Sequence, residues 1–444
     1  MEQRAHRVIN LIDDSSQQIL NMGVEEARDR LVAETPERLL EVRGSFALMR
    51  RDGENVLMAR SLDRPMRYFL AKEVEGPMLV IGERIDDIRA VLEEHGYLDQ
   101  FHPSYTRMVP AHHLMVLRLI GCPDPNPRLR RFFDPPRARF TGDLDRIGDS
   151  YVRALHNEVG EWISAQDADE PVGVLFSGGI DSGAVLVSAY HALLDSGQSP
   201  SRLKAFTLAV DGKGSDVEQA REFLARLHLD MLLEVVEVAA ETLDPYEAVE
   251  VIEDYKPLDV ECAAVALSLL RGIRDRYPQW RLLLDGDGGD ENLKDYPLEE
   301  GQELTIRSVV SNSMLYQEGW GVDAIKHSLT YSGGFSRGCV RTYAPARKLG
   351  FVGLSPFARP DVIAVAEGIP FDELTQGSNE KLYALKGEVV RRGMRSVLDV
   401  DFPVFPKRRF QQGALQETTF RDRFLVPPER YRSHFQRLHL GGGS

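Results

Sequence analysis

The stretch that decides the fold is Val174-Leu175-Phe176-Ser177-Gly178-Gly179-Ile180-Asp181-Ser182. The apolar residues 172–176 predict a buried strand, and residues 183–194 predict a helix. The glycines between them let a ligand approach the backbone closely, and the N-terminus of a helix attracts phosphate. The hydroxyls of Ser177 and Ser182 add donors, whereas the lysine of a GxxxxGK[ST] loop is absent. We therefore predict a loop that holds an anion of pyrophosphate size, with a plain capped turn as the alternative.

A second run, Asp285-Gly286-Asp287-Gly288-Gly289-Asp290-Glu291, also follows a predicted strand, at 281–284. Its carboxylates repel one another unless a cation lies among them. The carboxyl ends of the strands in an open α/β sheet face the ligand crevice, so we expect the two runs to meet at one edge. Asp181 and Asp290 are therefore the predicted Mg²⁺ ligands, approaching from opposite sides. An acidic surface turn is the alternative for the second run.

A third run, FPKRRFQQG at 405–413, lies in a basic segment of an otherwise acidic chain. The chain holds 54 Lys and Arg against 69 Asp and Glu, a net charge of −15. A cation delivered from this run would neutralise charge that builds up on a leaving pyrophosphate. A basic surface turn is the alternative.

Length and element order predict an α/β protein with a smaller β-rich part in front of it. The 444 residues are enough for two to four domains. Helical spacing covers 7–33, and a Pro-rich stretch at 122–136 indicates a linker or crossover. Between them, the predicted strands are 45–50, 56–59, 67–70, 78–81 and 113–119. From about 145 the order alternates between helices (147–163, 183–194, 216–226, 263–277) and strands (172–176, 205–210, 232–238, 281–284). Such alternation predicts a doubly wound parallel sheet, followed beyond 300 by mostly helical sequence.

Composition argues against several classes of function. An acidic chain is a poor binder of nucleic acid or anionic membranes, and no apolar run reaches the roughly 18 residues of a membrane span. Three cysteines, none in a CxxC pair, are typical of a reducing compartment, so we expect a cytoplasmic protein. Residues 441–444 are typical of an added linker.

The three runs in this order resemble the synthetase domain of the asparagine synthetase family, whose members are pyrophosphate-loop ATP pyrophosphatases. The SGGxDS loop matches at 177–182, and the family's SGEGxDE segment is similar to 285–291. Residues 211–229, 354–361 and 381–386 resemble later family elements. The resemblance implies an adenine-nucleotide α-hydrolase-like domain at 136–440.

Looser likenesses at 39–47, 59–68 and 82–88 resemble the family's Ntn-type glutaminase half. The family's glutaminase uses a cysteine directly after the initiator Met, where this sequence has Glu2. The residues ahead of 39–47 are also too few to form the opening strands of that half. We therefore expect residues 1–135 to be a truncated, glutaminase-inactive domain, similar to that of β-lactam synthetases and lasso-peptide cyclases.

The resemblance implies an AMP-forming ligase that uses ATP and Mg²⁺. A carboxylate attacks the α-phosphorus, pyrophosphate leaves, and a nitrogen nucleophile converts the acyl-adenylate into an amide. Lys407 resembles the family's phosphate-contacting lysine, and adenine is expected against the backbone near Leu208 and Gly286. The residues expected to hold the pyrophosphate and its metal are Ser177, Gly178, Gly179, Asp181, Ser182 and Asp290.

Two other classes of function stay open at this stage. One is a pyrophosphate-loop sulfurtransferase acting on RNA or a cofactor, which requires a reactive thiol near the site. The other is a non-catalytic regulatory or assembly protein on the same scaffold. The expected partners are a small-molecule or peptide carboxylate and an amine, with a homodimer and a separate ammonia-supplying protein as open alternatives.

Overall fold

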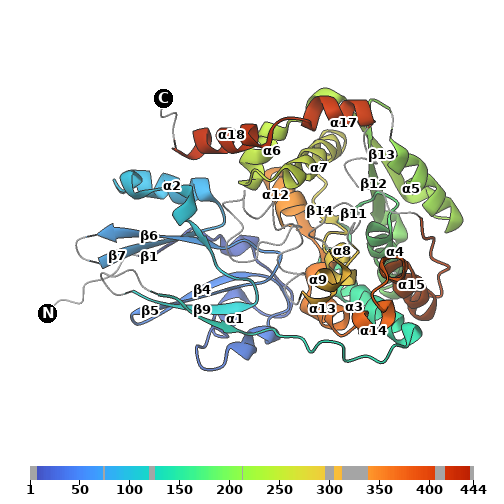
Figure 1. Cartoon of the computed structure of the whole chain (residues 1–444), viewed down its shortest axis with the longest axis horizontal. Coiled ribbons are helices and arrows are strands. Elements are labelled where there is room, and N and C mark those ends of the chain that lie inside the picture. Colours follow the sequence, from blue (N-terminus) through green and yellow to red (C-terminus); the bar gives the residue numbers. More distant parts are fainter. Residues whose placement is uncertain are drawn as a thin grey trace.

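A computed structural model describes residues 8–73, 76–119, 126–212, 214–295, 305–312, 339–405 and 416–440. The β-rich N-terminal part lies beside a larger part in which helices surround a sheet (Figure 1). None of the helices in these ranges is long and apolar enough to cross a membrane. The part of the chain described here therefore offers no membrane-spanning helix.

Two four-stranded sheets and a two-stranded sheet, in which β2 pairs antiparallel with β3, build the N-terminal part. The strand orders of the four-stranded sheets are β1-β7-β6-β8 and β10-β9-β5-β4. A shared apolar layer that includes Met58, Leu79, Ile81, Met115 and Leu117 joins them. The strands are β1 (Val8–Asn10), β2 (Gln18–Ile19), β3 (Gly44–Ser45), β4 (Ala47–Asp52), β5 (Asn55–Arg60), β6 (Arg67–Glu73), β7 (Gly76–Gly82), β8 (Arg107–Met108), β9 (His113–Arg118) and β10 (Arg128–Arg131), with helices α1 (Val24–Arg28) and α2 (Ile85–Glu94).

Two expectations about this part are wrong. The stretch predicted as helical, 7–33, forms β1, β2 and only the short helix α1 over its described residues. The parallel pairing of β1 with β7 outweighs the helical spacing, because strand formation depends on cross-strand partners more than on local pattern. The Pro-rich stretch, 122–136, is more than a linker, since β10 pairs antiparallel with β9; its first residues, 122–125, lie outside the described ranges.

The larger part is built on a parallel sheet, as predicted. Its strands are β11 (Val172–Leu175), β12 (Leu203–Val210), β13 (Leu233–Val238), β14 (Leu282–Leu284) and β15 (Val352–Leu354), in the order β13-β12-β11-β14-β15. Every neighbouring pair is parallel. The strand β15 was not predicted, because three residues carry too little pattern. The central strands are almost continuously apolar, as strands buried on both faces must be.

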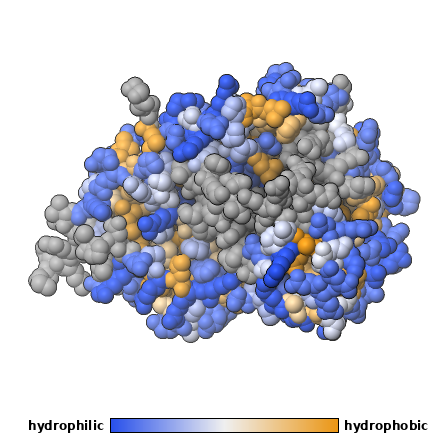
Figure 2. Space-filling view, in the orientation of Figure 1, coloured by the Kyte–Doolittle hydropathy of each residue, from blue (hydrophilic) through white to orange (hydrophobic). Residues whose placement is uncertain are grey.

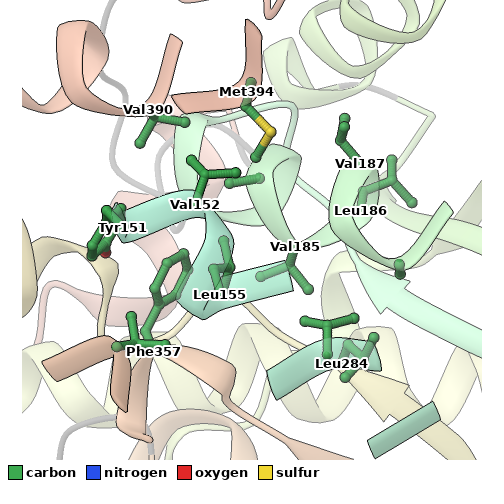
Figure 3. Packing of buried hydrophobic residues seen from close by; sticks show 14 of the residues in the cluster. Tyr151, Val152, Leu155, Val185, Leu186, Val187, Leu284, Phe357, Val390 and Met394 are labelled. Atoms are coloured by element: carbon green, nitrogen blue, oxygen red, sulfur yellow. The ribbon is translucent and has the colours of Figure 1, made fainter. Parts of the chain in front are cut away.

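Helices cover both faces of this sheet, which confirms the doubly wound architecture. One face packs against α3 (Leu144–Ser164), α4 (Ile180–Asp195), α5 (Ser215–Arg226) and α15 (Asn379–Leu398). Figure 3 shows this packing, with Leu155, Val185 and Leu284 in one cluster. The other face packs against α6 (Pro245–Ile252), α7 (Pro257–Arg276), α12 (Ala344–Lys348) and α18 (Pro428–Leu440). The remaining helices are α8 (Gly289–Leu293), α9 (Ile306–Ser311), α13 (Pro360–Glu367), α14 (Phe371–Thr375) and α17 (Glu417–Phe424).

The helices α3 and α15 cross at two glycines. A Cβ atom placed on Gly393 would lie 2.2 Å from the carbonyl oxygen of Gly148, and one on Gly148 would lie 2.6 Å from the carbonyl oxygen of Val389. Any side chain at this crossing would force the helices apart. The crossing therefore fixes the position of α15 against the rest of the α/β part.

The surface is largely hydrophilic on the face that Figure 2 shows, with hydrophobic residues scattered over it. The most exposed large apolar side chains among the described residues are Met231, at 74%, and Leu425, at 68%. Scattered exposed apolar residues are ordinary for a folded protein.

Candidate active site

The candidate site lies where the strand order of the parallel sheet reverses. The chain runs from β11 outward through β12 to β13, and then returns to place β14 on the other side of β11. Ligands of open α/β sheets bind at the carboxyl ends of the strands beside such a switch point. The two loops that leave β11 and β14 there are the two runs singled out in the sequence.

The first loop, 176–179, is stabilised by contacts of its own serines and by α5. The amide of Ser177 donates to Ser182 Oγ (3.3 Å), and the amide of Gly179 donates to Ser177 Oγ (3.3 Å). Gly178 has a φ of +75°, and a Cβ there would lie 2.7 Å from the backbone nitrogen of Ala220. Only glycine suits that position, because both its backbone conformation and its surroundings reject a side chain. The loop thus leads directly into the N-terminus of α4, where Asp181 lies in the first turn.

The second loop packs directly against the start of α4. A Cβ on Gly286 would lie 2.7 Å from the backbone nitrogen of Ser182, and one on Gly289 would lie 2.1 Å from Asp181 Oδ1. The predicted meeting of the two runs at one sheet edge is therefore confirmed. The roles of their side chains toward a ligand stay predictions.

Lys386 bridges the two carboxylates that we predicted to hold magnesium. Its Nζ atom lies 2.5 Å from Asp181 Oδ2 and 2.5 Å from Asp290 Oδ1, and Asp295 Oδ2 lies 3.5 Å away. Burial on its own lowers the pKa of this lysine, but the three carboxylates raise the pKa well above its ordinary value. The side chain is therefore a buried, charged ammonium group, fully surrounded by acids.

Lys386, which belongs to the run 381–386, was not predicted as a residue of the site. It lies on α15, about two hundred residues from Asp181 along the chain. The signal available in the sequence was a lysine among apolar residues of a predicted helix. A lysine in such a position is expected to be buried and therefore to pair with a buried acidic side chain. The glycine crossing of α3 and α15 fixes the helix that carries it.

Asp285 and Asp287 of the second loop, the first buried and the second half-buried, lie near a polar pair on the segment before α12. Asp287 accepts a hydrogen bond from Thr342 Oγ1, and Arg341 Nε donates to Asp259 on α7 (3.2 Å). Burial raises the pKa of Asp287 to about 6, although the contacts with Thr342 and Arg341 lower it. Burial and the neighbouring Asp287 also raise the pKa of Asp285 well above its ordinary value. A carboxyl group with a pKa near 6 is suited to exchange protons at neutral pH.

The N-terminal part forms one wall of this region. Asp63 Oδ2 accepts a hydrogen bond from Arg359 (2.7 Å), and both side chains are buried. A cavity of about 20 Å³, enough for one water molecule, is lined by Asp63, Asp285, Thr342 and Ser355, among others. The acidic loop after β14 is thus enclosed by groups from both parts of the chain.

The other predicted site residues lie as follows. Leu208 is on β12 beside β11, with its side chain in the apolar core, so only its backbone is available to a ligand. Lys407 lies outside the described residues. Cys262, the thiol relevant to the sulfurtransferase alternative, is buried on α7, and burial raises its pKa to about 11. Among the described residues, no group of three or more His, Cys, Asp or Glu side chains is arranged to hold a metal.

A parallel sheet with a glycine-rich loop and an acidic loop at its switch point has the architecture in which open α/β domains bind their ligands. The family model described as asparagine synthase matches residues 163–321, which include β11 to β14 and both loops. Residues 163–321 are thus similar to the asparagine synthase domain of the asparagine synthetase family. That family comprises ATP-dependent amidating carbon–nitrogen ligases. No curated protein matches the chain significantly.

Proposed function

We propose that the chain is an AMP-forming ligase that activates a carboxylate with ATP and joins it to ammonia or an amine. The observation that carries this proposal is the placement of Asp181 and Asp290, from two different loops, on one Lys386 Nζ atom at the switch point. The pair supplies hard oxygen donors beside an anion-binding loop. This combination suits a nucleotide triphosphate and its metal ion.

The first step forms a bond between a carboxylate oxygen of the substrate and the α-phosphorus of ATP. The bond from that phosphorus to the bridging oxygen breaks, and pyrophosphate leaves. The backbone amides of the first turn of α4 and the hydroxyls of Ser177 and Ser182 are the donors that would bind the leaving group. Asp181 and Asp290 are the residues that would hold Mg²⁺. When bound there, Mg²⁺ supplies charge neutralisation for the phosphates.

The second step forms the carbon–nitrogen bond. The nitrogen lone pair attacks the acyl carbon, the bond from carbon to the adenylate oxygen breaks, and AMP leaves. The nitrogen then has a proton to lose. Asp287 is the half-buried carboxylate whose pKa of about 6 suits it to take up that proton.

The nitrogen source is proposed to be ammonia or an amine rather than glutamine hydrolysed by this chain. A glutaminase of the thiol type needs an accessible, ionisable cysteine. Cys262 is buried with a raised pKa, which also disfavours thiol-based sulfur transfer from it. A direct comparison of ammonium chloride, amines and glutamine as nitrogen donors tests this part.

The proposal is tested by exchange of labelled pyrophosphate into ATP in the presence of candidate carboxylates. Asp181→Ala and Lys407→Ala should abolish exchange. Asp169→Ala, at the exposed amino end of β11, is the control and should leave exchange unchanged. Exchange at the wild-type rate in either site variant contradicts the assignment.

A further inference from the structure

Lys386 and a bare divalent cation exclude each other between Asp181 and Asp290. The Nζ atom lies 2.5 Å from one oxygen of each carboxylate. Magnesium binds carboxylate oxygens at about 2.0–2.1 Å, so an ion bridging these two oxygens would occupy the place of the ammonium group. Either the ammonium group or the metal ion alone satisfies the two carboxylates, but both cations do not fit between these oxygens at once.

The fold holds Lys386 in that place. Its side chain is only 3% exposed, and Asp295 lies 3.5 Å from Nζ as a third acidic neighbour. A lysine ammonium has three donors, and three carboxylates surround this one. Because the helix that carries Lys386 is fixed by the crossing at Gly148 and Gly393, the ammonium group leaves the pair only when other anionic partners replace the carboxylates.

We propose that the protein does not take up a bare divalent cation at this site and binds the metal only together with a nucleotide triphosphate. The inference rests on the proposed function, because it assumes that the site takes a nucleotide. The triphosphate brings anionic oxygens that serve both as new partners for Lys386 and as further ligands for the metal. Lys386 is thus a positioning residue that makes metal uptake depend on nucleotide.

The experiment measures Mn²⁺ binding to the full chain by the electron paramagnetic resonance signal of the free ion. It is done with and without α,β-methylene-ATP, whose bridge between the α- and β-phosphorus resists cleavage. Because the triphosphate chelates Mn²⁺ by itself, the signal that the analogue removes in the absence of protein is subtracted. We expect wild-type protein to bind bare Mn²⁺ at least about tenfold more weakly than Lys386→Met, which keeps an unbranched side chain and removes its charge. With the nucleotide analogue, wild-type protein should bind Mn²⁺ tightly.

Two further variants make the result specific. Lys381→Met, on the exposed side of the same helix, is the matched control and should show no gain in bare Mn²⁺ binding. Adding Asp290→Asn to Lys386→Met should abolish the gain, because it removes one of the two carboxylates. A gain that survives this addition overturns the assignment to the pair.

Two results overturn the proposal outright. One is wild-type protein that binds bare Mn²⁺ as tightly as it does with the analogue. The other is Lys386→Met that remains folded by circular dichroism and gains no Mn²⁺ binding. If that variant does not fold, Lys386→Gln is measured in its place under the same criterion. Failure of the proposed function is a separate result, because it appears as absence of analogue binding in every variant whatever the bare ion does.

Discussion

The backbone of Gly289 lies against the carboxylate of Asp181, so closely that a Cβ atom on the glycine would stand 2.1 Å from Oδ1. The acidic loop after β14 and the first turn of α4 therefore share one van der Waals surface. Their mutual position depends on the absence of a single methyl group. The two loops act as one preformed unit rather than as two independent ligand-binding segments.

Gly289→Ala is expected to separate the two loops and to lower pyrophosphate exchange by about tenfold or more, because displacement of a positioned group by 1 Å has effects of that order or larger. Exchange kinetics at saturating ATP give the measurement. Gly353→Ala on β15 is the control, since its Cβ would make an ordinary contact of 3.6 Å with Leu283. An unchanged rate in Gly289→Ala would show that the loops tolerate separation.

Thr342→Val is expected to change the pH dependence of amide formation. The hydroxyl of Thr342 donates to Asp287 and so stabilises its ionised form, which lowers the pKa of that carboxyl. Without the donor the pKa rises above about 6, and the acidic limb of the rate profile moves to higher pH. Pyrophosphate exchange, which precedes transfer to nitrogen, should keep its profile. A limb that stays in place contradicts the role of Asp287.

Asp63→Ala is expected to destabilise the protein by about 3–5 kcal/mol, because it leaves the buried guanidinium of Arg359 without its carboxylate. Urea unfolding followed by circular dichroism measures the loss. The double variant Asp63→Ala with Arg359→Met should be less destabilised than the single one, since no uncompensated charge remains. If the free energy of unfolding falls equally in the single and the double variant, the pairing of Asp63 with Arg359 is not the cause of the destabilisation.

Stability is expected to fall in acid because of two buried histidines. Burial lowers the pKa of His439 from 6.5 to about 4 and that of His112 from 6.5 to about 3. Below pH 6.5 the unfolded chain takes up protons at these rings before the folded chain does. The free energy of unfolding therefore decreases as the pH falls from 6.5 toward 4 and below.

The urea concentration at the midpoint of unfolding is measured between pH 7 and pH 4, a range that includes the ordinary histidine pKa. His439→Gln removes one of the titrating rings and should flatten the decrease. His228→Asn, at an exposed left-handed position that asparagine tolerates, is the control. The same slope in His439→Gln and wild-type protein would refute this cause.

The sequence was sufficient to predict the parallel sheet and the contact between its two loops. Both depend on local signals, namely apolar runs of strand length that are followed by glycine-rich turns. The N-terminal residues 8–33 were misassigned because β1 owes its conformation to β7, and helical spacing along the sequence contains no information about that partner. The strand β15 was too short to detect.

The places of Lys386 and Asp63 in the site could not be predicted from local sequence patterns. Each belongs to the site through a partner far along the chain, with Lys386 directed at Asp181 and Asp63 at Arg359. Both lie in stretches that resemble family elements, 381–386 and 59–68, but the resemblance did not assign either side chain to the site. Their roles depend on how the helices and sheets pack against one another, and this packing involves the whole core.

Lys386 and Asp181 are 205 residues apart, and this separation bears on how the protein is made. A ribosome releases the acidic loops long before it releases α15, and a domain generally folds as a unit. Until α15 emerges and docks, Asp181, Asp290 and Asp295 have no counterion from this lysine. Since Leu385 and Val389 of α15 belong to the core on one face of the sheet, the neutralised centre and that core are completed together, late in synthesis.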